Sequence, residues 1–172
     1  AFKQAASETD AVITSGGVSV GEADYTKAMM RELGDVAFWK IAMRPGRPMA
    51  VGRMGSSVLF GLPGNPVAVM VTFLAFVRPA LLKMMGCSDT APPLLQAACT
   101  ETLRKKPGRT EYQRGLVTRT PQGELQVRTT GNQGSGVLSS MVQGNGLIVL
   151  HHGQADVRPG DTVDVMMFDG VI

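Results

Sequence analysis

The 172-residue sequence has only two cysteines and two histidines. Cys87 and Cys99 show neither the spacing of a disulfide framework nor the pairing of a structural zinc site. The sequence therefore does not indicate a disulfide-rich secreted protein, and we expect a cytoplasmic one. His151 and His152 follow a β-like run without clustered acids, which favours surface histidines over metal ligands.

Long hydrophobic runs and a strong excess of one charge are also lacking. The longest apolar run, Val67 to Val77, is closed by Arg78 and falls short of the roughly 20 residues that cross a bilayer. We expect it to form a buried helix. The net charge is +3, and neither half has the basic excess that nucleic-acid binding requires. Neither a membrane nor a nucleic acid is expected as a partner.

Apolar residues make up 44% of the chain, enough for a packed core, and the first half alternates between helix-like and strand-like segments. Such alternation predicts an α/β domain with a parallel component in its sheet. Asn65 and Pro66 suit the first positions of a long apolar helix that reaches about Met85. The other expected elements are a helix at 1–8, a strand at 10–15, a helix at 22–33, and strands at 35–43, 49–54 and 57–62.

The second half has a different character. Residues 86–93 have the composition of a linker, and short β-like runs separated by glycine- and proline-rich turns follow without a convincing helical period. This pattern predicts an all-β module, a small barrel, and divides the chain into domains at 1–90 and 91–172. The expected strands are 95–103, 111–118, 124–130, 136–141, 147–150 and 162–167.

A glycine-rich turn, ITSGGVSVGEAD at 13–24, joins an expected strand to an expected helix. Glycine lets the backbone approach a ligand closely, and the amides with the following helix N-terminus favour a phosphate. Ser15 and Ser19 add hydroxyl donors, although an ordinary tight turn explains the glycines equally well. Asp24 is either a helix-capping residue or a carboxylate ligand of Mg²⁺, which binds one or two carboxylates together with substrate phosphates.

Two basic clusters suit small anions. Lys40 and Arg44 are four residues apart, so in one extended strand both would point to the same face and converge on one anion. Protective charges at a solvated sheet edge are the alternative. The second cluster, Arg104 to Arg109, fits either an anionic ligand or a solvated surface.

Five segments in order closely resemble the molybdopterin molybdotransferase family, which includes bacterial MoeA and the E domain of gephyrin. They are residues 10–27, 38–52, 61–73, 107–115 and 129–141, and together they span nearly the whole chain. The resemblance implies part of a three-layer, MogA-like molybdopterin-binding domain followed by a β-barrel domain. It also implies the reaction: molybdate is inserted into adenylylated molybdopterin and AMP is released, with Mg²⁺ assisting.

The resemblance also assigns roles to residues of this chain. Asp24, Lys40 and Arg44 match catalytic positions, with Asp24 as the metal-linked acid and the two cations suited to molybdate or phosphate. Family members often carry lysine where Arg44 stands, which changes the geometry of oxyanion binding. The remaining positions match substrate-binding residues: Ser15, Gly16, Gly17, Ser19, Pro63, Gly64, Asn65, Pro66, Arg114 and Ser135.

The chain is expected to be the C-terminal portion of a longer protein that forms a homodimer, and its activity alone is left open. Two other functions stay as alternatives. One is the related molybdopterin adenylyltransferase, although that family is a single α/β domain and does not account for the β-rich half. The other is a non-catalytic scaffold module, in the manner of gephyrin.

Overall fold

The computed structural model describes residues 1–16, 28, 32 and 34–168. The expected helix at 22–33 lies largely outside these residues, although Ala28 and Glu32 are both helical. The chain forms two compact units. Unit 1 comprises residues 1–41 and 46–90, and unit 2 comprises residues 42–45 and 91–172.

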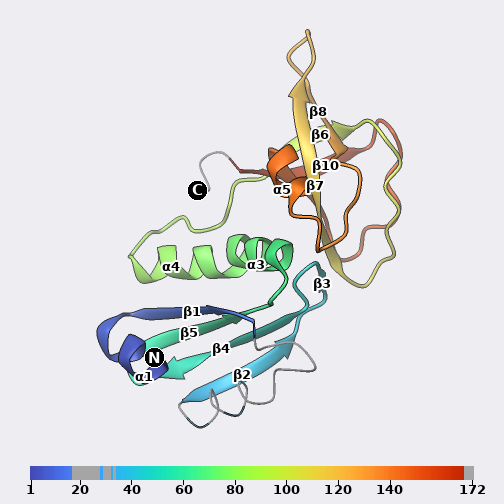
Figure 1. Ribbon diagram of the computed structural model, residues 1–172. Coiled ribbons are helices and arrows are strands. Elements are labelled where there is room, and N and C mark those ends of the chain that lie inside the picture. Colours follow the sequence, from blue (N-terminus) through green and yellow to red (C-terminus); the bar gives the residue numbers. More distant parts are fainter. Residues whose placement is uncertain (17–27, 29–31, 33, 169–172) are drawn as a thin grey trace. The chain divides into compact units, whose positions relative to one another are not determined.

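Unit 1 is built on a four-stranded mixed sheet with the strand order β1-β5-β4-β2. β1 and β5 are parallel, with Ser15 opposite Leu62, whereas β5, β4 and β2 are successively antiparallel. The α/β class expected of the first half is confirmed (Figure 1). The elements of unit 1 are α1 (Phe2–Glu8), β1 (Ala11–Ser15), β2 (Asp35–Lys40), β4 (Pro48–Met54), β5 (Ser57–Leu62), α3 (Pro66–Thr72), η1 (Phe73–Val77) and α4 (Arg78–Met84).

Helices cover both faces of this sheet, because alternate strand residues point to opposite sides. Ala50 and Leu59 pack with Ala6 of α1 in one hydrophobic cluster. Met49 and Phe60, their neighbours in the chain, pack with Val77 in the cluster beneath the long helix. Unit 1 therefore has the three layers expected, helix, sheet and helix. α3, η1 and α4 form one continuous helix over one face of the sheet (Figure 1).

The long helix is a core element of unit 1. Its full span, Pro66–Met84, is longer than the apolar run Val67–Val77 and is long and apolar enough to cross a membrane by length and composition. A sheet-covering core helix passes the same test, and Val67, Val71 and Val77 are fully buried. Pro79 lacks an N–H and crowds the preceding turn, which accounts for the wider π-helical turn at Phe73–Val77 just before it.

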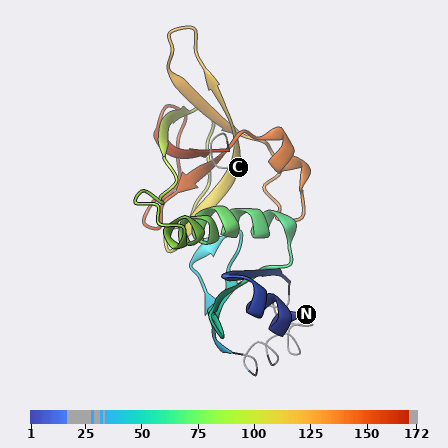
Figure 2. The same cartoon turned by 90° about the vertical axis from the view of Figure 1, so that its left-hand side faces the viewer.

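Unit 2 is a closed barrel of five strands, as the second half of the sequence predicts. Its ring runs β7-β8-β6-β10-β9 and closes by the pairing of β9 with β7. Gly115 of β7 packs closely against the core of the barrel, because a Cβ there would lie 2.9 Å from Ile148 Cγ1 and would force that side chain to shift. Figure 2 shows the β7–β8 hairpin extending beyond the ring. The strands are β6 (Leu95–Cys99), β7 (Thr110–Arg119), β8 (Leu125–Thr129), β9 (Gly146–Leu150) and β10 (Thr162–Met167).

Two sequence-based expectations are wrong in detail. The strand expected at 35–43 is interrupted: β2 ends at Lys40, Ile41 N–H bonds Arg47 O, and Met43–Arg44 form a separate strand, β3, that pairs with β7. At 136–141, where a strand is expected, the chain forms a turn and then the first residues of the short helix α5 (Ser139–Gln143). Burial of Ser140 and Met141 outweighs the β-like composition of this segment.

Removing the Ile148 side chain tests the barrel core. Ile148 is fully buried among Cys99, Val127 and Val165, so Ile148→Ala is expected to lower the unfolding free energy by about 2–5 kcal/mol. Val142→Ala, at a side chain 83% exposed, is the control and should change it by less than about 0.5 kcal/mol. Urea titration followed by circular dichroism measures both, and equal losses would contradict this core.

Candidate functional site

The glycine turn and the PGNP loop meet at the carboxyl ends of β1 and β5. Gly16 follows β1 with a φ of 89° and donates its N–H to Leu62 O at 3.0 Å and Pro63 O at 3.3 Å. A Cβ on Gly64 would lie 3.5 Å from Gly16 Cα, so the two backbones are in close contact. Crevices at the carboxyl ends of strands are where α/β sheets bind ligands.

The Gly16 amide is occupied by these backbone hydrogen bonds. The contribution of Gly16 is therefore its left-handed conformation and close packing, and donors for a phosphate must come from other groups. Ser15 is exposed at this edge. Gly17, Ser19 and Asp24, the other predicted residues of the turn, lie outside the described residues.

The PGNP loop leads directly into the long helix. Asn65 is the N-cap and Pro66 the first helical residue, as the sequence predicts, but the Asn65 side chain makes no capping bond. Its Oδ1 is buried and has no hydrogen-bond partner among the described residues. Pro63 is buried and Gly64 exposed. The loop thus presents an unpartnered acceptor and the start of a helix at the edge where β1 ends.

Lys40 and Arg44 belong to different units. Lys40 is exposed at the end of β2 in unit 1, and Arg44 is exposed in β3 of unit 2. Lys40 and Arg44 therefore do not share one face of a continuous strand, because the strand is broken between them. Their convergence on one anion stays a prediction.

Arg114 is the most deeply buried cation of unit 2, with 1% of its surface exposed. Its Nε donates to Ser140 Oγ at 2.9 Å, and its Nη2 donates to Gly134 O at 3.0 Å. Both acceptors are neutral, and no carboxylate pairs with this guanidinium among the described residues. Burial lowers the pKa of Arg114, and the nearby positive charge of Arg44 lowers it further. A buried charge held only by neutral groups has affinity for an anion.

A small chamber of about 80 Å³ adjoins this guanidinium, and we call it the inner chamber. Arg44, Arg104 and Arg114 supply its cations, and Glu111 is its carboxylate. Nη1 of Arg114 has no hydrogen-bond partner among the residues the structure describes. The remaining residues around the chamber are Pro45, Tyr112, Gln113 and Gln133.

The loop between β8 and α5 shapes the inner chamber. Gln133 Oε1 accepts a hydrogen bond from Arg114 N at 2.7 Å, and Gln133 Nε2 donates to Arg114 O at 3.1 Å, so the side chain clamps the strand at this residue. Ser135 lies exposed in the same loop, one residue beyond the carbonyl of Gly134 that binds Arg114. The structure thus brings the predicted Arg114 into a site with Arg44, and Ser135 onto the loop that holds it.

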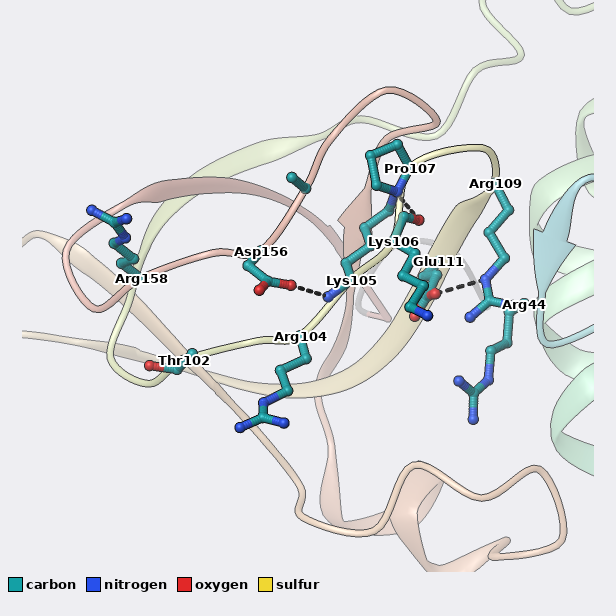
Figure 3. Close-up of a pocket in the computed structure, with 11 residues that line it drawn as sticks. Arg44, Thr102, Arg104, Lys105, Lys106, Pro107, Arg109, Glu111, Asp156 and Arg158 are labelled. Carbon is teal, nitrogen blue, oxygen red and sulfur yellow. Dashed lines mark hydrogen bonds and ion pairs between the residues drawn. The ribbon is translucent and has the colours of Figure 1, made fainter.

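A larger chamber of about 880 Å³, the outer chamber, shares Arg44, Arg104 and Glu111 with the inner one (Figure 3). Six cationic side chains and two carboxylates line it, an excess of four positive charges. Glu111, with 5% of its side chain exposed, accepts a hydrogen bond from Arg109 Nε at 2.7 Å. The cations are Arg44, Arg104, Lys105, Lys106, Arg109 and Arg158.

Sequence reasoning missed several residues of these chambers. Ser140 and Gln133 lie in the segment 129–141 that resembles the family, but no role was predicted for either, because their importance comes from contacts with Arg114 across the fold. The basic cluster Arg104 to Arg109 is evident in the sequence, but the sequence alone does not distinguish a site for an anionic ligand from a solvated surface. In the structure this segment lines the outer chamber.

Comparisons with known proteins agree with this architecture. Residues 1–83 match the family described as "Probable molybdopterin binding domain", and residues 96–168 match "MoeA C-terminal region (domain IV)". The whole chain is 44% identical to a molybdopterin molybdenumtransferase of Haemophilus influenzae, of which it covers 43%. It is 35% identical over 96% of its length to one of Staphylococcus aureus, of which it covers 39%.

Solved structures show the same fold. A molybdenum cofactor biosynthesis protein of Pyrococcus furiosus matches 97% of this chain with a TM-score of 0.72 and 28% identity, and the chain covers 52% of that protein. The molybdopterin biosynthesis MoeA protein of Pyrococcus horikoshii matches 97% of this chain with a TM-score of 0.74 and 24% identity, with 37% of that protein covered.

The chain spans less than half the length of the curated relatives it matches. The two family models nevertheless match most of it, in the order of the two structural units. The chain therefore belongs to the molybdopterin molybdenumtransferase family of molybdenum cofactor biosynthesis.

Proposed function

We propose that this chain takes part in inserting molybdate into adenylylated molybdopterin with release of AMP, and that the inner chamber is its oxyanion site. The observation that carries the proposal is Arg114, a buried guanidinium bound only by neutral acceptors beside a second arginine. The family's relatives are named for molybdenum transfer to molybdopterin, which requires a site for an oxyanion.

The chemistry of the inner chamber suits molybdate. A tetrahedral dianion can accept hydrogen bonds from Arg114 Nη1 and from the guanidinium of Arg44, because each presents planar N–H donors. Ser140 and Gly134 fix the orientation of Arg114 before the anion arrives, so little reorganisation is needed on binding. Glu111 is held by Arg109, which limits its repulsion of the anion.

The carboxyl edge of β1 and β5 is the proposed site for the phosphate end of the pterin substrate. Ser15 and the PGNP residues Pro63, Gly64, Asn65 and Pro66 lie at this edge, and the long helix begins there. A helix N-terminus favours an anion. Gly17 and Ser19 complete the proposed set, with Gly16 acting through its backbone conformation.

Magnesium is proposed as the assisting metal, with Asp24 as its carboxylate. Among the described residues no group of three or more His, Cys, Asp and Glu side chains could hold a metal ion. The metal proposal therefore depends on Asp24 and substrate phosphates, a combination typical of Mg²⁺. We further propose a cytoplasmic location, in keeping with two free cysteines, and a homodimeric parent protein.

The experiment that tests the proposed function is molybdate-dependent release of AMP from adenylylated molybdopterin by this chain in the presence of magnesium. Release supports the proposal in full. Binding of molybdate and of the pterin nucleotide without release would limit this chain to binding its substrates. Failure to bind either would contradict the proposal and favour the scaffold alternative.

Replacing Arg114 by lysine tests the oxyanion site. Lysine keeps the charge but loses the planar fork, so molybdate affinity should fall at least about tenfold. Calorimetric titration with molybdate measures this. Arg128→Lys, on the exposed face of β8 and outside both chambers, is the matched control and should retain the original affinity. Equal affinities of all three proteins would contradict the site; Ser140→Ala, which removes one acceptor from Arg114, gives an independent check.

A double-mutant cycle tests whether Lys40 and Arg44 converge on one anion. If both contact the same molybdate, Lys40→Ala and Arg44→Ala will be non-additive, with a coupling of about 0.5–3 kcal/mol in the binding free energy. Additive losses, or no effect of Lys40→Ala, would show that Lys40 does not share the oxyanion with Arg44.

A further inference from the structure

The outer chamber has more positive charge than its own residues neutralise. Glu111 is bound by Arg109, and Asp156 Oδ1 accepts a hydrogen bond from the backbone N–H of Lys105 at 2.7 Å. The ammonium of Lys105 donates to Gln154 O at 2.7 Å, which ties it to the loop after β9. Both carboxylates and two of the six cations, Arg109 and Lys105, are therefore already engaged.

The other four cations of the chamber have no ion pair within the described part of the chain: Arg44, Arg104, Lys106 and Arg158. Figure 3 shows the guanidinium groups of Arg44 and Arg104 extending to the same side of the chamber from two different segments. The Lys106 side chain lies between them in this view, whereas Arg158 lies at the opposite end. Like charges so arranged repel one another unless an anion binds among them.

We propose that Arg104 and Lys106, together with Arg44, form a second anion site in the outer chamber for a phosphate-bearing ligand. Guanidinium groups bind phosphate oxygens in pairs, and the ammonium adds a point charge. The chamber measures about 880 Å³ against about 80 Å³ for the inner one, so it admits a larger and more highly charged anion. A diphosphate or a phosphate ester has both properties.

The second site goes beyond the proposed function, because it does not depend on what the inner chamber binds. Arg114, Tyr112 and Gln133 line the inner chamber alone, and Lys106 lines the outer chamber alone. The two sites can therefore be altered separately. Arg44 and Arg104 line both chambers and are the cations through which one bound anion would influence the other.

Titration of the 172-residue chain with inorganic pyrophosphate at constant ionic strength, followed by calorimetry, tests this site. We expect saturable binding that Arg104→Gln and Lys106→Gln each weaken at least about tenfold, the loss expected for one charge-assisted hydrogen bond. Arg128→Gln removes the same charge from β8, outside both chambers, and should change the affinity less than about twofold. Circular dichroism melting curves of all variants check that they are folded.

Repeating the titration with saturating molybdate and with the Ser140→Ala variant separates the two sites. If pyrophosphate still binds in the presence of saturating molybdate and to the Ser140→Ala variant, the result supports a separate site, whether or not molybdate itself binds. Titration with glycerol 3-phosphate, a simple phosphomonoester, distinguishes the two kinds of ligand. If it binds more tightly than inorganic phosphate, the ligand is an organic phosphate; if it binds more weakly, the ligand is a free inorganic anion. The proposal is wrong if pyrophosphate does not bind, or if Arg128→Gln weakens binding as much as Arg104→Gln and Lys106→Gln do.

Discussion

The buried guanidinium of Arg114 is the constraint around which the barrel unit is organised. A charge with 1% of its surface exposed is costly unless each N–H finds a partner, and no carboxylate of the described residues pairs with it. Ser140 and Gly134 satisfy two of its nitrogens. Both acceptors lie in the segment between β8 and β9, so the position of that segment and the orientation of the arginine depend on each other.

Neighbouring elements add to this arrangement. Gln133 bonds the backbone of Arg114 on both its N–H and its carbonyl, which fixes the loop against β7. β3 pairs with the start of β7, with Arg44 opposite Glu111, and so brings a second guanidinium to the same chamber. The barrel thereby concentrates positive charge at one site, whereas the anion site proposed at the sheet of unit 1 is of a different kind, made of backbone and the start of a helix.

Patterns of neighbouring residues in the sequence correctly predicted the elements that are determined by their own residues. The α/β half, the barrel strands, and Asn65 and Pro66 at the start of the long helix all follow from periodicity, turn residues and capping preferences. α5 was missed because it is a short helix held by Met141 and Ser140 in the fold, with a β-like composition. β3 was missed because the break after Lys40 depends on pairing with β7, distant in the sequence.

The candidate site follows the same division. The motifs pointed to Arg114, Arg44 and the PGNP loop, but the spacing argument that joined Lys40 to Arg44 assumed a continuous strand. The partners Ser140 and Gln133 and the two chambers depend on side chains that meet only after folding. Gly16 was expected to donate to a phosphate, and its amide is instead bonded to Leu62 and Pro63, because the turn must first be fixed against β5.

The most direct test of the oxyanion site is to locate molybdenum by its anomalous scattering in crystals of the chain soaked with molybdate. We expect a peak in the inner chamber within hydrogen-bond distance of Arg114 Nη1 and beside Arg44. Molybdenum bound elsewhere on the chain, with the inner chamber empty, would contradict it.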